Sequence, residues 1–333
     1  MVVYGGNADR RMLHLEICQM VPISPATLFS GSVSGIDIYA AADEFSEPIL
    51  FCGKNEPVES RKLREIMDAG VLKLFVSTES FQLYQSYLQD HWQQIFDDKK
   101  LSTATRTTVL SEVMRNILQK SFQSGNSEVI VNSSRMLGAG IVKILNEEKV
   151  LVSRLCNVLH HDYATFTHST NVACYAALLA KGLGYSIQEQ NEIVIGALLH
   201  DLGKLSVDER ILRKAGRLDE FEFRAVQKHP LIGYRQLADR EDLNHSQLMM
   251  VYQHHEKLNG KGYPVGLVGE EIHPWARLCA VVDVYEALTS ARPYRSTMEQ
   301  KVALSILQKA AETELDAEFV KVWSELVLDW RSL

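Results

Sequence analysis

Two short strings of the sequence are rich in side chains that bind metal ions. In LLHDLGK, His200 and Asp201 are adjacent, and in HHEKLNGKGYP, His254 and His255 precede a glycine-rich turn. Histidine and carboxylate groups suit iron, manganese or zinc. Two adjacent pairs supply more ligands than one ion needs, so the sequence predicts a cluster of at least two metal ions, of the kind that serves phosphate chemistry. The fold must therefore bring these two distant strings together.

Three further candidate ligands stand alone in helical patterns. His168 lies early in an expected helix, His229 lies in AVQKHP at the end of a charged helix, and Asp283 lies in CAVVDVYEAL among apolar residues. A single histidine on an apolar helix is more often an ordinary core or surface residue. An ionised carboxylate in such a helix is costly unless it is paired or metal-bound, so Asp283 fits a salt bridge as well as a ligand. Only the joint pattern favours metal binding.

Composition excludes several classes of function. The net charge of -7 argues against a broad surface for DNA or RNA. No apolar run approaches the roughly 20 residues that span a bilayer, and no signal peptide is evident, so no membrane contact is expected. The cysteines are scattered and lack C-x-x-C spacing, which indicates thiols in a reducing cytoplasm; they are Cys18, Cys52, Cys156, Cys174 and Cys279.

A chain of 333 residues accommodates two domains. Residues 1–105 mix strand-like runs, such as Leu13 to Val21, with turns, which predicts a small α/β domain, and we expect its role to be regulatory. Residues 106–150 are interpreted as connecting helices interrupted near Gly125 and Gly138. These helices either pair two copies of the chain into a homodimer or are ordinary packing helices. Residues 151–333 are almost wholly helical. The expected fold is therefore mainly α.

Several strings in the second half occur together in one known family. They are HS at His168, HDLGK, HP at His229, HHEKLNGKGYP, GLVGEEI and DVYEALTSARPYR from Asp283. In order and spacing, the segment from about 150 to 330 resembles the HD-GYP family, a branch of the HD superfamily of metal-dependent phosphohydrolases. This resemblance implies an all-α HD-type fold and hydrolysis of the bacterial second messenger cyclic di-GMP.

The resemblance also assigns roles to the candidate residues. It implies that one metal ion is bound by His168, His200 and Asp283, that a second is bound by His229, His254 and His255, and that Asp201 bridges the two. The expected metal is iron, with manganese as the substitute. Asp201 and Lys204 are the expected catalytic residues, and the substrate phosphates are expected to contact Lys204, Arg292 and Arg295. The ordinary alternative for the two arginines is a solvated loop charge.

The glycine-rich turn has its own expected role. Gly260 and Gly262 allow backbone conformations and close approaches that other residues resist, and Pro264 fixes the exit from the turn. Tyr263 is expected to be structural or to face a partner rather than to be catalytic. The resemblance implies that this Gly-Tyr-Pro loop lies beside the active site and contacts partner proteins with GGDEF domains.

Two departures from the family pattern bear on the chemistry. Some members bind a third metal ion through a glutamate four residues before the first histidine, where this chain has Ala164, so two ions are expected. The aspartate usual in the HHE string is Asn259 here, which removes a charge from the loop. Three functions remain open: hydrolysis of cyclic di-GMP to linear pGpG or GMP, hydrolysis of another cyclic dinucleotide, and a metal-bound receptor that signals through protein contacts without turnover.

Overall fold

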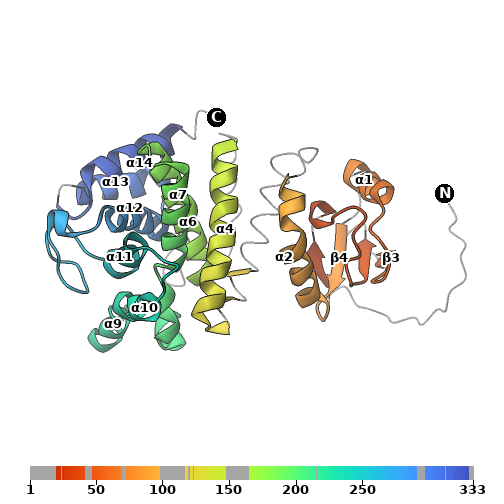
Figure 1. Cartoon of the computed structure of the whole chain (residues 1–333), viewed down its shortest axis with the longest axis horizontal. Helices are drawn as coiled ribbons and strands as arrows, with labels where there is room; N and C mark the ends of the chain where they lie inside the picture. Colours follow the sequence, from red (N-terminus) through yellow and green to blue (C-terminus); the bar gives the residue numbers. More distant parts are fainter. Residues whose placement is uncertain are drawn as a thin grey trace, which may run out of the picture. The chain divides into compact units, whose positions relative to one another are not determined.

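The computed structural model divides into two compact units, Met1–Val109 and Leu110–Leu333 (Figure 1). We call them the N-terminal unit and the helical unit, and each is described by itself. The described residues are 20–23, 25–41, 47–69, 73–97, 117–118, 121–122, 124–147, 165–214, 216–290, 297–311 and 313–329.

The N-terminal unit contains a four-stranded antiparallel sheet in the order β1-β4-β2-β3. Strand β4 is one of the two inner strands, and its residues Leu74, Phe75 and Val76 are buried. Because successive side chains of a strand point to opposite faces of the sheet, both faces are covered here. The expectation of a small α/β region is confirmed, although only the last two residues of the strand predicted at Leu13 to Val21 belong to β1, and the remainder lies outside the described residues. The elements are β1 (Met20–Ile23), η2 (Pro25–Thr27), β2 (Ile38–Ala41), β3 (Ile49–Cys52), α1 (Ser60–Ala69), β4 (Lys73–Ser77) and α2 (Phe81–Asp97).

The helical unit follows the predicted mainly α pattern. Its elements are α4 (Ser127–Glu147), α6 (Thr165–Gly182), α7 (Ile187–Leu199), η4 (Leu202–Ser206), α8 (Glu209–Leu212), α9 (Glu220–Val226), α10 (His229–Leu237), α11 (His245–Gln253), η5 (Gly269–Glu271), α12 (Pro274–Thr289), α13 (Gln300–Ala310) and α14 (Ala317–Asp329). Within the described ranges, no helix combines the length and apolar character needed to cross a bilayer.

The core of the helical unit is built around α6. Every residue from Val172 to Ala180 is buried, and α6 packs against α4, α7, α12 and α14 (Figure 1). Its small alanine side chains let these neighbours approach closely on all sides. Tyr175 of α6, Tyr285 of α12 and Trp323 of α14 meet with ring centroids 5.1 to 5.6 Å apart. This packing fixes α6 against α12, the two helices that carry His168 and Asp283.

Local start signals place two of the other helices that lead into the site. Ser186 accepts a hydrogen bond from the backbone N–H of Glu189 at the start of α7, and Asn244 does the same for Gln247 at the start of α11. In both cases the third helical residue returns a bond to the capping residue, which satisfies backbone donors that a helix start otherwise leaves unpaired. These caps set where α7 and α11 begin, and the ligand pairs follow their ends.

Two sequence-based expectations about helix ends were wrong. Gly125 does stand at a break, with a φ of 62°, but α4 runs straight through Gly138. A Cβ at Gly138 would lie 3.2 Å from Ile195 Cγ1 of α7, so this glycine marks a close helix approach rather than an interruption. His229 does not end the charged helix α9; it is the first residue of α10, with Pro230 next, where a proline is compatible with a helix start.

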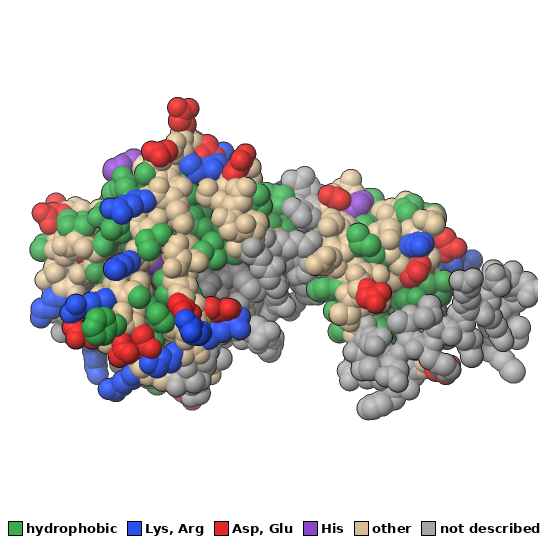
Figure 2. All heavy atoms as spheres, turned by 90° about the horizontal axis from the view of Figure 1, so that it is seen from below, with side chains coloured by type: hydrophobic (Ala, Val, Ile, Leu, Met, Phe, Trp, Pro, Cys, Tyr) green, Lys and Arg blue, Asp and Glu red, His purple; other side chains and the backbone are tan. Residues whose placement is uncertain are grey.

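The surface of the helical unit carries both signs of charge. On the face shown in Figure 2, acidic and basic side chains are interspersed, with hydrophobic side chains scattered among them. That face therefore presents no continuous basic area of the kind that binds a nucleic-acid backbone.

Candidate metal centre

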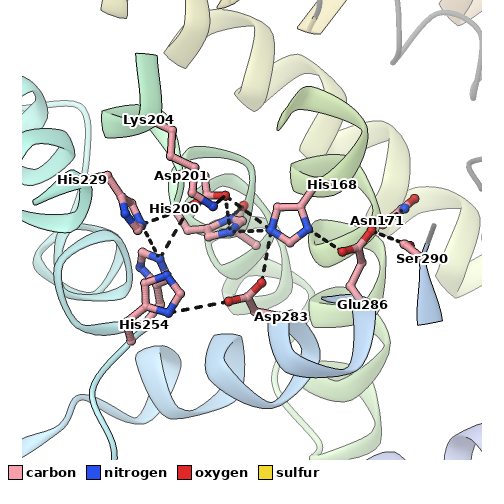
Figure 3. Close-up of polar contacts among 12 residues, drawn as sticks. His168, Asn171, His200, Asp201, Lys204, His229, His254, Asp283, Glu286 and Ser290 are labelled. Atoms are coloured by element: carbon pink, nitrogen blue, oxygen red, sulfur yellow. Dashed lines mark hydrogen bonds and ion pairs between the residues drawn. The ribbon is translucent and has the colours of Figure 1, made fainter. Parts of the chain in front are cut away.

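The seven predicted ligands lie together in the helical unit (Figure 3). They form two groups, and within each group the candidate ligand atoms all lie within 4.8 Å of one another. The first cluster comprises His168, His200 and Asp283, and the second comprises Asp201, His229, His254 and His255. Helices α6 and α12 supply His168 and Asp283, whereas the other ligands stand at the ends of α7 and α11 and at the start of α10.

The first cluster is compact and buried. The Nε2 atom of His168 lies 3.1 Å from Asp283 Oδ1 and 3.3 Å from His200 Nε2. It also lies 3.4 Å from Asp201 Oδ2. Three different segments thus direct nitrogen and oxygen atoms at one point.

The second cluster gathers around the other oxygen of Asp201. His229 Nε2 lies 3.1 Å and His254 Nε2 lies 3.8 Å from Asp201 Oδ1. The two Nε2 atoms are 3.2 Å apart. His255 completes the group and also lies 3.9 Å, through Nδ1, from Asp283 Oδ2. One carboxylate therefore faces both clusters, one oxygen to each.

The ring orientations test whether these residues fit metal ions. The Nδ1 atoms of His200, His229 and His254 lie 2.6, 2.7 and 2.9 Å from backbone carbonyl oxygens. A carbonyl only accepts, so each Nδ1 carries the proton and each Nε2 presents a lone pair to the cluster. Two lone pairs 3.2 Å apart, as in His229 and His254, repel unless a cation lies between them. Two nitrogens about 2.1 Å from one ion, at a right angle, are about 3.0 Å apart.

A buried oxygen supports the same conclusion. Asp201 Oδ1 is buried and has no hydrogen-bond donor among the described residues. Such an ionised oxygen is costly in the interior unless a cation compensates it. Asp201 Oδ2, in contrast, accepts a hydrogen bond from Lys204 Nζ at 2.5 Å. The donor set therefore fits divalent metal ions.

Electrostatics put several of the candidate ligands in the protonation states that metal binding needs, with His168 as the exception. Burial by itself raises the pKa of Asp201, but Lys204 and nearby histidines outweigh it and hold this pKa well below its ordinary value. Burial lowers the pKa of His200, holds that of His254 well below its ordinary value, and lowers that of His255 to about 3. Ionised carboxylates and neutral imidazoles are the forms that coordinate metals.

The sequence matches the HD domain family over residues 143–319. The chain belongs to the HD domain family. The predicted HD-type character is confirmed, and so is the resemblance to HD-GYP proteins.

Two curated relatives are similar to part of this chain. The cyclic di-GMP phosphodiesterase response regulator RpfG of Xanthomonas campestris is 35% identical over 195 residues, which are 58% of this chain and 52% of the relative. The 3'3'-cGAMP-specific phosphodiesterase 3 of Vibrio cholerae is 40% identical over 154 residues, 46% of this chain and 33% of the relative. The chain thus spans about half the length, or less, of these relatives.

A solved structure shares the fold. Bd1817, an HDG"Y"P protein from Bdellovibrio bacteriovorus, matches with a TM-score of 0.66 at 20% identity, covering 92% of this chain and 99% of that one. The likeness supports the HD-type helical arrangement.

Glu256, which the sequence-based reasoning left without a role, anchors the Gly-Tyr-Pro loop of this HD domain. Its buried carboxylate accepts backbone hydrogen bonds from Val265, Gly266 and Leu267 at 2.7 to 3.1 Å. A carboxylate that satisfies three successive N–H groups makes charge-assisted bonds, stronger than neutral ones. The signal was available, because Glu256 directly follows the histidine pair.

The same loop packs against the second cluster. The Tyr263 ring lies 4.7 Å from the His255 ring, centroid to centroid, and the backbone N–H of Tyr263 donates to His255 O. A Cβ at Gly262 would come within 2.4 Å of the Glu256 backbone, so only glycine fits there. Burial raises the pKa of Tyr263, which keeps its hydroxyl protonated. Gly260 has a φ of 74°, a conformation that favours glycine.

Gly203 of the HDLGK string has a role that the sequence did not reveal. A Cβ there would lie 2.0 Å from the backbone oxygen of His229 and 2.7 Å from Gly233 N. The segment that follows Asp201 therefore touches the backbone of α10 directly, which brings His229 close to the Asp201 carboxylate.

Glu286 of α12 is a second buried acid that sequence reasoning passed over. Its Oε2 lies 2.5 Å from His168 Nδ1. Burial opposes the charged form of His168, but Glu286 and Asp283 outweigh it and raise the pKa of His168 to about 10. The signal was a second acid three residues after Asp283, on the same face of an apolar helix.

Some predicted residues lie outside the described residues. These are Arg292, Arg295 and Ala164, so their expected roles, and the expected absence of a third metal ligand before His168, stay predictions.

Proposed function

We propose that this protein is a metal-dependent phosphodiesterase that hydrolyses a cyclic dinucleotide, with cyclic di-GMP as the substrate. The observation that carries the proposal is the position of Asp201. Its two carboxylate oxygens face two separate groups of candidate ligands, and Lys204 binds the oxygen Oδ2. The names of the two curated relatives support the substrate class.

We further propose a dinuclear iron centre, which manganese can replace. Imidazole together with carboxylate suits these ions. His168, His200 and Asp283 would hold one ion, His229, His254 and His255 the other, and Asp201 both. When bound, two such ions supply a water-derived nucleophile at neutral pH and offset negative charge on phosphate oxygens.

The chain's own residues then position the substrate. The side chain of Lys204 is 17% exposed, so its ammonium group stands between the buried Asp201 and solvent. A phosphate oxygen arriving at this edge meets a positive charge already held by the bridging carboxylate. Arg292 and Arg295 are proposed to bind other phosphate oxygens, because a guanidinium group binds such oxygens in pairs.

The exposed fractions of the histidine side chains support a substrate that reaches the centre from the side of the second cluster. The His255 side chain is 24% exposed, whereas those of His229 and His254 are fully buried. Tyr263 of the Gly-Tyr-Pro loop packs against His255. A partner with a GGDEF domain and a homodimer remain predictions, to be tested by pull-down and by the molar mass in solution.

The test uses the full chain loaded anaerobically with Fe²⁺ and incubated with cyclic di-GMP or with 3'3'-cGAMP. Chromatography separates the linear dinucleotide from the mononucleotides. We expect turnover of cyclic di-GMP to pGpG, GMP or both. The matched control is Asp201→Asn, which keeps the shape of the side chain and removes its charge; equal turnover in this variant would mean that another protein in the sample is responsible.

Two outcomes would redirect the proposal. Turnover of 3'3'-cGAMP alone would keep the enzyme and change its substrate. Tight binding of cyclic di-GMP to the iron-loaded chain without any product would contradict the enzyme and support the receptor function.

The arginines have a test of their own. Arg295→Ala is expected to raise KM for the cyclic dinucleotide about tenfold or more, because a charge-assisted bond to phosphate is lost, while metal content stays the same. Arg213→Ala, at a guanidinium group that is 78% exposed, is the control. An unchanged KM and kcat in Arg295→Ala would refute its role.

A further inference from the structure

We propose that Glu286 is a positioning residue that makes the first cluster the tighter metal site, so that this cluster fills before the second. The proposal rests on the metal-binding part of the proposed function. It concerns only the chain's affinity for ions and does not depend on which cyclic dinucleotide is hydrolysed.

The geometry of Glu286 is fixed from two helices (Figure 3). One carboxylate oxygen accepts from His168 Nδ1 at 2.5 Å. The other accepts from Asn171 Nδ2 of α6 at 3.0 Å and from Ser290 Oγ, at the end of α12, at 2.7 Å. Glu286 is 1% exposed, so water does not compete for these bonds. A buried carboxylate with both oxygens occupied holds the His168 ring in one orientation.

That orientation determines which nitrogen of His168 faces the cluster. Because Nδ1 donates its proton to Glu286, Nε2 is the nitrogen that faces Asp283 and His200, and it offers its lone pair when a metal ion displaces its proton. A carboxylate partner of this kind raises the basicity of an imidazole ligand. His168 is therefore a stronger donor to a metal ion than a histidine held by a neutral group.

The second cluster lacks an equivalent among the contacts of its described residues. The Nδ1 atoms of His229 and His254 face the backbone oxygens of Val226 and Val251. Hydrogen bonds with an ionised partner are roughly twice as strong as neutral ones. The support behind the two clusters therefore differs in charge, although their ligand types are similar.

The distribution of carboxylates acts in the same direction. Asp283 Oδ1, Asp201 Oδ2 and the Glu286 charge behind His168 all lie on the side of the first cluster. The second cluster has Asp201 Oδ1 and, more distantly, Asp283 Oδ2, which is 3.9 Å from His255. Lys204 offsets part of the charge on Asp201 Oδ2. A divalent cation is thus attracted more strongly to the first cluster.

The experiment titrates metal-free full-length protein with Mn²⁺ by calorimetry at neutral pH. We expect two unequal binding steps in the wild type. Glu286→Gln keeps the size of the side chain and removes its charge, and it should weaken the tighter step by 10- to 100-fold while changing the weaker step by less than about threefold. Ser290→Ala, which removes one bond to Glu286, should weaken the tighter step by a smaller factor.

A second measurement identifies the site that fills first. Crystals grown with one equivalent of Mn²⁺ should show anomalous scattering between His168, His200 and Asp283. The matched control for the titration is Glu325→Gln, at an exposed position of α14, which should leave both steps unchanged.

The outcomes separate this inference from the proposed function. Two-step binding in the wild type with the first ion in the second cluster, or equal weakening of both steps in Glu286→Gln, would overturn the role of Glu286 and leave the metal centre intact. No binding of Mn²⁺ by the wild type would overturn the metal centre itself. If Glu286→Gln does not fold, Ser290→Ala decides, and an unchanged tighter step in that variant contradicts the inference.

Discussion

The two halves of the candidate metal centre are built from similar side chains but supported in different ways. In the first cluster, His168 and Asp283 belong to the long buried helices α6 and α12, and a charged carboxylate stands behind the histidine. In the second, the histidines stand at helix ends, and Tyr263 packs against His255. Equal ligand chemistry therefore does not mean equal affinity or equal access, because the surroundings of each ligand set both.

The largest expected effect comes from the residue that joins the two halves. Asp201→Ala should abolish hydrolysis and lower the bound metal from about two ions per chain to one or none, because each cluster loses an anionic oxygen. Metal analysis and activity of the purified variant check this. Full loading in the variant would show that the clusters assemble independently, and three ions in the wild type would show a ligand near His168 beyond those assigned.

Metal removal should destabilise the helical unit. With free metal at 1,000 times its Kd, each bound ion stabilises the folded state by about 4 kcal/mol. For a domain of about 200 residues each kcal/mol corresponds to roughly 2–4 °C in Tm, so chelation should lower Tm by about 10 °C or more. Scanning calorimetry with and without chelator measures this, and Asp201→Ala should show a smaller difference. Identical Tm values for the wild type would contradict a structural contribution from the metals.

A glycine substitution tests how the halves are brought together. Gly203→Ala should destabilise the protein by about 3 kcal/mol and weaken metal binding by the second cluster, because the new Cβ would overlap the His229 backbone. Gly138→Ala is the control, since its nearest neighbour is a flexible Ile195 side chain and alanine favours a helix by about 1 kcal/mol. Chemical denaturation compares the unfolding free energies of the two variants, and equal values would contradict a close approach at Gly203.

The smallest effects are the opposite pH responses of the two halves in the metal-free protein. Burial lowers the pKa of His255 to about 3, whereas the unfolded value is about 6.5. Between these two pH values the unfolded chain binds a proton at His255 and the folded chain does not. The contribution of His255 to stability is therefore fully present above about pH 6.5 and is lost as the pH falls toward 3. Glu286 and Asp283, despite burial, raise the pKa of His168 to about 10, so its contribution is complete below about pH 6.5 and is lost as the pH rises toward 10.

Unfolding free energies between pH 5 and pH 9 check these responses. His255→Ala should reduce the slope of the unfolding free energy against pH on the acid side of the curve, below about pH 6.5. The reduction should be less than about 1.4 kcal/mol per pH unit, because this side chain is partly exposed, and the slope on the alkaline side should not change. His168→Gln should flatten the alkaline side instead. Parallel changes in both variants would show that the two halves titrate as one unit.

Local signals in the sequence were sufficient for much of the helical unit. The almost wholly helical character predicted for residues 151–333 is met by helices such as α12 and α13. The capping residues of α7 and α11 act within one helical turn, so neighbouring residues determine them. All seven candidate ligands could be named because histidine and carboxylate side chains in apolar helices are conspicuous. In the N-terminal unit, alternation indicated strands but not the order β1-β4-β2-β3.

What the sequence by itself determined is thus the set of candidate ligands and the helices that carry them. Only the tertiary structure decided which atoms meet: the two faces of Asp201, the contact between Gly203 and the His229 backbone, and the bond from His168 to Glu286, 118 residues away. A helical period or a cap depends on residues a few positions apart, whereas these contacts depend on how α6, α10 and α12 pack. For the same reason Gly138 looked like a break, since a glycine at a close helix approach and a glycine at a helix end have the same side chain.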